Sequence, residues 1–310
     1  MNRPLISVVL PAFKATYFKL AIESILGQTY QNFELIIVND ASPEDLDSIV
    51  NEFNDDRISY YKNEKNIGGN NLVKNWNHCL GYANGEYFVL ASDDDIYHES
   101  YLEKMVELSD QYVDVDIFHC RVGIIDNECE LMGLSKTCSV KESCIDFIWH
   151  RYNGNRVQLA PEFFVRTSAL REIGGFIEFP KAWHSDLATW IALSKDNGLV
   201  YISEVLFKWR SSGENISSIT CDDDKIIASI LYSTWLENFL ADLEPANEFE
   251  EFQLKHLNKR AFNKLESEMV VMFQQYSYAR ILSILNKEPG LMQDQLKKLY
   301  RKVLKQKLFK

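Results

Sequence analysis

The sequence lacks an excess of positive charge. Its 310 residues contain 33 Lys and Arg against 45 Asp and Glu, which gives a formal net charge of −12. A general affinity for nucleic acid requires a basic surface that pairs with phosphates. The charge balance therefore argues against a nucleic acid partner.

Long apolar runs and paired cysteines are also lacking. No apolar stretch approaches the roughly 18 residues of a membrane-spanning helix, and the run "LISVVLP" is short and ends at Pro11 without a cleavage site. We therefore expect neither a transmembrane helix nor a signal peptide. None of the six cysteines forms a C-x-x-C pair, and no histidine lies at zinc-ligand spacing. This pattern favours a reduced, cytoplasmic compartment.

Apolar, β-branched runs alternate with helix-like segments over the first hundred residues. The runs predict buried strands at 6–13, 33–40, 58–63 and 86–91. The segments between them predict helices at 18–28, 42–53 and 70–85. Near-continuous apolar strands that alternate with helices are typical of a parallel sheet covered on both faces. The sequence therefore predicts an α/β fold.

Capping residues suggest where these helices begin and end. Ser42 is the expected N-cap of the second helix, with Pro43 at its first helical position, and Gly85 is expected to end the third. The pattern is less regular after residue 100 and becomes helical throughout from about residue 222. In the irregular part, a short helix is expected within 166–176, and a turn followed by a helix within 183–198.

Polar residues gather where the predicted strands end. In parallel sheets, ligands bind beyond the carboxyl ends of the strands. The segments that fall at this edge are Pro11-Ala12-Phe13, Asn39-Asp40 and Ser92–Asp95. Carboxylate oxygens bind Mg²⁺ or Mn²⁺, and a cation held there can carry a substrate diphosphate. The other interpretation of the acidic triplet is a solvated turn.

Three further residues have both a structural and a functional interpretation. Asp40 either caps a helix or accepts the imide N–H of a uracil or thymine base, and Phe13 is either a core aromatic or a stacking partner for a base. Asp186, in "AWHSDLATW", is either a helix-start acid favoured by the helix dipole or a general base. Glu162 and Glu178 are the next acids to consider for that role.

Several motifs occur in a recognisable order: "ISVVLPAF", "AIESILGQTYQNFELIIVNDAS", "NIGG", "NGEYFVLASDDDIY", "LREIGGF" and "SDLATW". Over residues 4–220 this order resembles the inverting family 2 glycosyltransferases of the GT-A fold. The resemblance implies a Rossmann-like, mainly parallel sheet with helices on both faces. It divides a 1–220 domain into a nucleotide-binding half (1–98) and an acceptor-side half (99–220), followed by a helical C-terminal region (221–310).

The resemblance also implies roles for individual residues. Asp94, supported by Asp95, would hold Mn²⁺ or Mg²⁺, and Asp186 would be the catalytic base. The nucleotide-binding residues would be Pro11, Ala12, Phe13, Asp40, Asn66 and Asp93.

This sequence departs from the family pattern at three places. Ser185 stands where relatives have the Glu of an "ED" pair, and Ser211 follows Arg210 where many relatives have a His. Trp76 stands where relatives often have an Arg. Arg210 and Lys74 are therefore the candidates for the positive charge beside the diphosphate.

The expected activity is transfer of a sugar from a UDP- or TDP-sugar to an acceptor hydroxyl, with inversion. A saccharide or lipid-linked saccharide acceptor is expected, in bacterial-type surface polysaccharide or glycolipid assembly. One alternative is a nucleotidyltransferase, although "PAFKAT" lacks the Gly-rich basic loop expected after the first strand. Another is a non-catalytic module that binds sugar nucleotides or glycans.

Residues 297–310 contain seven Lys or Arg and no acid, and their apolar residues fall on one helical face. A basic amphipathic helix can lie on the inner, anionic face of a membrane. It can equally pack on the body of the protein or on a second subunit. The tail therefore predicts either peripheral membrane contact or an oligomer contact.

Overall fold

The computed structural model describes residues 3–213, 222–274 and 276–285. Its centre is one sheet in the order β3-β2-β1-β4-β9-β6-β10-β5, with β7 beside β6 and β8 beside β10. The strands are β1 (Ile6–Ala12), β2 (Phe33–Asn39), β3 (Ile58–Lys62), β4 (Tyr87–Leu90), β5 (Ile96–Tyr97), β6 (Ile117–Ile125), β7 (Leu131–Leu134), β8 (Lys141–Glu142), β9 (Phe163–Arg166) and β10 (Leu199–Arg210).

The sheet is mainly parallel, as the sequence predicted. β1 pairs in parallel with β2 and β4, β2 pairs with β3, and β6 pairs with β10. β9 lies antiparallel between β4 and β6 and joins the two parallel parts. The carboxyl ends of β1, β2 and β4 therefore meet at one edge, where polar residues follow each strand.

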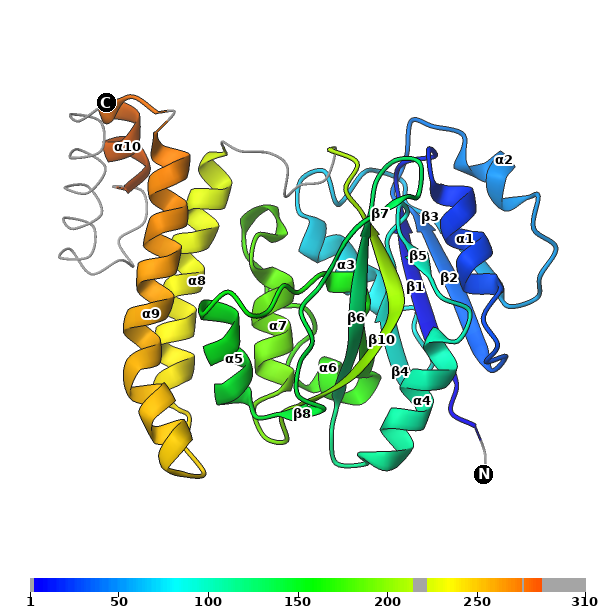
Figure 1. Ribbon diagram of the computed structural model, residues 1–310. Helices are drawn as coiled ribbons and strands as arrows, with labels where there is room; N and C mark the ends of the chain where they lie inside the picture. Colours follow the sequence, from blue (N-terminus) through cyan, green and yellow to red (C-terminus); the bar gives the residue numbers. More distant parts are fainter. Residues whose placement is uncertain (1–2, 214–221, 275, 286–310) are drawn as a thin grey trace.

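Helices cover both faces of the sheet (Figure 1). Along β1, Ile6, Val8 and Leu10 pack into one core and Val9 into the other, because successive strand residues point to opposite faces. The helices of the first core are α1 (Phe18–Leu26), α2 (Leu46–Val50) and α4 (Tyr101–Gln111). Those of the second are α3 (Leu72–Leu80), α5 (Cys144–Tyr152), α6 (Thr167–Glu172) and α7 (Ser185–Leu193).

The C-terminal part is helical, as expected, and consists of α8 (Asp223–Ala241), α9 (Glu248–Phe273) and α10 (Tyr278–Leu285). α8 and α9 lie side by side at the outer flank of the second core (Figure 1). α9 packs on α5, and α8 packs on the short 3-10 turn η2 (Pro180–Ala182), so the C-terminal helices and the sheet domain share one hydrophobic core. No described helix combines the length and apolar character needed to cross a membrane. The basic segment 297–310 lies outside the described residues.

Two predicted helix boundaries are wrong. The second helix begins at Leu46, with Asp45 as its N-cap, because the Ser42 hydroxyl instead accepts the N–H of Glu44 and donates to the carbonyl of Phe13. The third helix ends at Leu80. Gly85 lies against the start of β1, where an added Cβ would be 2.5 Å from the nitrogen of Ser7. Its role is therefore close strand packing and not helix termination.

Candidate active site

A pocket of about 680 Å³ opens at the carboxyl ends of β1, β2 and β4. It brings together most of the residues that the sequence singled out: Pro11, Ala12, Phe13, Asp40, Asn66, Asp93, Asp94, Asp95 and Asp186. Lys74 and Arg210 do not line it.

Asp93 ties the end of β4 to the turn after β1. Its Oδ2 accepts the backbone N–H groups of Phe13 and Lys14, both at 2.8 Å. Burial raises the pKa of Asp93, although these two N–H groups oppose the shift. The carboxylate thus fixes the geometry of the loop predicted to hold the base and ribose.

Asp95 is buried in the pocket wall and is held by Arg210. Its Oδ1 accepts the backbone N–H of Arg210 at 2.8 Å, and the Arg210 Nε donates to the carbonyl of Asp94, also at 2.8 Å. Arg210 is fully buried, and its guanidinium also donates to the carbonyls of Asp126 and Asn127. Arg210 therefore braces the acidic turn from inside the protein, and the structure does not bring its charge to the pocket.

Asp94 is the member of the triplet whose surroundings fit a cation best. It lines the pocket and accepts the Ser92 hydroxyl at 2.5 Å. The pKa of Asp95 is raised well above the ordinary value, first by burial and next by the negative charge of Asp94. Crowded carboxylates at a pocket wall are stabilised by a divalent cation, and oxygen ligands suit Mg²⁺ or Mn²⁺.

Asp40 holds the "NIGG" segment against the end of β2. Its carboxylate accepts the N–H groups of Ile67 and Gly68 and the side-chain amide of Asn63. A Cβ at Gly68 would lie 2.8 Å from Asp40 Oδ2, so this close approach requires glycine. The Asn66 side chain accepts the N–H of Gly69 and closes the loop. The structure therefore gives Asp40 a loop-holding contact beside the pocket.

Asp186 lies in the first turn of α7, after a strained segment. Lys181, Ala182 and His184 have positive φ angles of 56°, 54° and 69°, which residues with a Cβ rarely adopt. Burial raises the pKa of Asp186, and the positive charge of Arg151 partly offsets that effect. A half-buried carboxylate with a raised pKa in a pocket suits a general base.

The pocket also includes residues that sequence reasoning missed. They are Arg151 and Gln158 near the end of α5, Lys181 and Trp183 before α7, and Glu268 on α9. No local motif marks them, because they come from the irregular middle of the chain and from the C-terminal helices. Glu162 and Glu178, the reserve candidates for the base, do not line the pocket.

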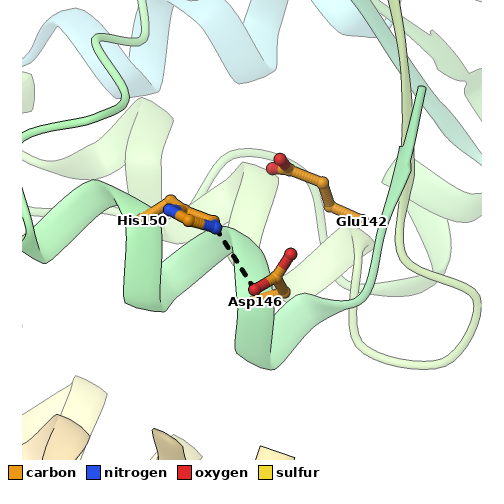
Figure 2. Close-up of side chains that lie close together, drawn as sticks. All are labelled: Glu142, Asp146 and His150. Carbon is orange, nitrogen blue, oxygen red and sulfur yellow. Dashed lines mark ion pairs between the residues drawn. The ribbon is translucent and has the colours of Figure 1, made fainter. Parts of the chain in front are cut away.

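A second group of metal-ligand types, Glu142, Asp146 and His150, lies outside the pocket (Figure 2). Asp146 Oδ1 is 3.4 Å from His150 Nε2 and accepts the side-chain amide of Gln253 on α9. Glu142 forms an ion pair with Arg156. Because protein partners already offset these charges, we interpret the cluster as a link between α5, its following loop and α9.

The chain belongs to the glycosyl transferase family 2, whose model matches residues 7–170. It is 25% identical to an uncharacterized glycosyltransferase of Haemophilus influenzae, over 91% of this chain and 90% of that protein. It is 26% identical to the UDP-Glc:alpha-D-GlcNAc-diphosphoundecaprenol beta-1,3-glucosyltransferase of Escherichia coli, over 70% of this chain and 81% of that protein. The predicted family is confirmed.

Solved structures share the fold. The S. aureus TarS 1-349 fragment in complex with UDP-GlcNAc superposes with a TM-score of 0.68 at 17% identity, over 96% of this chain and 90% of that chain. A Pyrobaculum calidifontis mannosyltransferase in complex with GDP-Man and Mn²⁺ superposes with a TM-score of 0.56 at 17% identity, over 98% and 88% of the two chains. The predicted GT-A fold is confirmed.

Proposed function

We propose that this protein transfers a sugar from a UDP-sugar to a hydroxyl of a saccharide or lipid-linked saccharide, with inversion at the anomeric carbon. The observation that carries the proposal is that Asp40, Asp93, Asp94 and Asp186 line one pocket. The Escherichia coli relative, whose name specifies a UDP-glucose donor and a lipid diphosphate acceptor, supports the substrate class. Surface polysaccharide or glycolipid assembly is the proposed setting.

The donor would lie along the carboxyl ends of the strands. Asp40, Asn66 and Phe13 line the part of the pocket proposed for the base, and the Asp93-held turn receives the ribose. Asp94, supported by Asp95, is the proposed ligand of Mn²⁺ or Mg²⁺. This cation would offset the charge of the departing diphosphate.

Asp186 is the proposed base. Its carboxylate takes the proton from the acceptor hydroxyl as the hydroxyl oxygen attacks the anomeric carbon from the face opposite the nucleotide. Such a base contributes about 10²–10⁴-fold to the rate. The raised pKa of Asp186 favours proton acceptance, because a more basic carboxylate binds the proton more strongly.

The test is a panel of nucleotide sugars and acceptors assayed for nucleotide release in the presence of Mn²⁺ or Mg²⁺. Acceptor-dependent UDP release, with an inverted linkage identified by NMR of the product, is the expected result. Binding of sugar nucleotides without acceptor-dependent release from any member of the panel would contradict the proposal.

A further inference from the structure

Part of the pocket wall contains buried polar atoms without a partner among the described residues. They are Arg151 Nε, both amide atoms of Gln158 and the indole N–H of Trp183. Buried polar groups in folded proteins are almost always hydrogen-bonded. These atoms have almost no exposed surface of their own, so a ligand group completes their hydrogen bonds only where the side chain turns toward the pocket.

Arg151 and Gln158 reach the pocket from the two sides of one turn. Arg151 lies in the last turn of α5 and lines the pocket. The chain turns at Gly154, whose φ is 72°, and Gln158 lines the pocket again. The hydroxyl of Tyr152, next to Arg151, donates to the hydroxyl of Tyr232 on α8 at 2.8 Å. α5 is thus anchored beside the pocket, so Arg151 is presented from a fixed element.

The charge of Arg151 acts on the Asp186 side of the pocket. It lowers the pKa of Asp186 and of His184. The pKa of Asp95 responds instead to burial, to Asp94 and Asp93, and to Arg210. Arg151 is therefore placed near the proposed base, where the acceptor must arrive.

We propose that Arg151 and Gln158 form the acceptor subsite, and that this subsite selects acceptors with a phosphate or diphosphate group close to the attacked hydroxyl. The inference rests on the proposed function. A planar guanidinium binds two phosphate oxygens at once, which a neutral acceptor cannot use. The Gln158 amide offers two donors and an acceptor, which suit the hydroxyls of the adjoining sugar.

The experiment compares two synthetic probes that differ only in charge: a phenoxyalkyl N-acetylglucosaminyl diphosphate and the matching neutral phenoxyalkyl N-acetylglucosaminide. The full-length protein is first saturated with UDP and Mn²⁺, and each probe is then titrated by calorimetry. We expect the diphosphate probe to bind about 10-fold or more tightly than the neutral probe, as an Arg–phosphate hydrogen bond allows.

Three variants locate the effect. Arg151→Met should remove the preference for the diphosphate probe and leave UDP affinity unchanged, whereas Arg151→Lys should retain part of the preference. Gln158→Leu should weaken both probes, because its proposed contacts are with sugar hydroxyls. Lys255→Met removes an exposed cation on α9 that does not line the pocket and serves as the matched control.

Separate outcomes would overturn the inference and the proposed function. Equal or undetectable binding of the two probes by UDP-loaded wild-type protein would overturn the inference alone. A loss of UDP affinity in Arg151→Met, with an unchanged melting temperature, would instead assign Arg151 to the donor. Failure of the wild-type protein to bind any sugar nucleotide would overturn the proposed function itself.

Discussion

His184 stacks on Tyr232, with ring centroids 4.6 Å apart and ring planes 15° apart. The Nε2 of His184 is also 3.1 Å from the hydroxyl of Ser229, one helical turn before Tyr232 on α8. Burial lowers the pKa of His184 to about 3, so its imidazole is neutral at physiological pH. These contacts hold His184, the left-handed N-cap residue of α7, and α8 thereby helps to position Asp186.

Ser229→Ala tests this positioning. We expect kcat to fall about 2- to 10-fold, because losing one buried hydrogen bond of about 0.5–1.5 kcal/mol loosens the start of α7. The Kd for UDP should not change, since Ser229 does not line the pocket. Thr234→Ala, which removes a hydroxyl from the same helix, is the control for general destabilisation of α8. Equal kcat values for the two variants would show that Ser229 does not position the base.

Asp186→Asn tests the proposed base. Turnover should fall about 10²-fold or more, because a neutral amide cannot take the acceptor proton. The melting temperature and UDP affinity should be nearly unchanged, since Asn keeps the shape of the side chain and can still accept the N–H of Leu187. In the wild type, the rate should rise with pH as Asp186 deprotonates, at a pH above the usual Asp range because its pKa is raised.

Glu178→Gln is the control for Asp186→Asn, because Glu178 is exposed and does not line the pocket. Its turnover should match that of the wild type. An Asp186→Asn variant with near-normal turnover on a verified acceptor would remove Asp186 from the mechanism.

Asp94→Asn and Asp95→Asn should have different effects. Asp94→Asn should abolish the Mn²⁺-dependent part of UDP binding and leave the melting temperature nearly unchanged, as EDTA should do for the wild type. Asp95→Asn should alter the melting temperature more, because Asp95 is buried and bound to the backbone of Arg210. Calorimetry with and without Mn²⁺, together with thermal unfolding, separates the two roles. Unchanged Mn²⁺-dependent affinity in Asp94→Asn would contradict its assignment as a metal ligand.

Glu162 predicts a pH dependence of stability. It is 1% exposed, one carboxylate oxygen has no partner among the described residues, and burial raises its pKa well above the ordinary value. The folded protein therefore binds this proton more tightly than the unfolded chain. The stability from this group is fully present below the ordinary Glu pKa of about 4.5 and is lost as pH rises through the folded pKa.

Glu162→Gln should remove this loss. The free energy of unfolding of the variant minus that of the wild type should grow as pH rises from the ordinary to the raised pKa of Glu162. The growth should be about 1.4 kcal/mol per pH unit. The His119 imidazole, 3.3 Å from Glu162, is neutral in the folded protein because burial lowers its pKa to about 3. Its titration in the unfolded chain is common to both proteins and cancels in the difference. Urea unfolding of both proteins at pH 5 and pH 8 measures the difference. A pH-independent difference would show that Glu162 is ionised in the folded protein.

Local patterns in the sequence predicted the nucleotide-binding half well. The strands at 6–13, 33–40 and 86–91 were evident because buried parallel strands are continuous apolar runs. The start predicted for the helix within 42–53 was wrong because the Ser42 hydroxyl is used in a contact with Phe13, 29 residues earlier in the chain. A capping preference is local, and a tertiary hydrogen bond can override it.

The sequence by itself determined the α/β plan, the family and the gathering of Pro11–Phe13, Asp40 and Asp93–Asp95 at one sheet edge, because strand ends follow from local periodicity and the family from motifs in a fixed order. Only the tertiary structure decided that Arg210 faces inward and that Arg151 supplies a positive charge to the pocket. Side-chain direction in these segments depends on β10 pairing with β6 and on α5 packing against α9. Such contacts join residues far apart in the chain, and no local pattern encodes them.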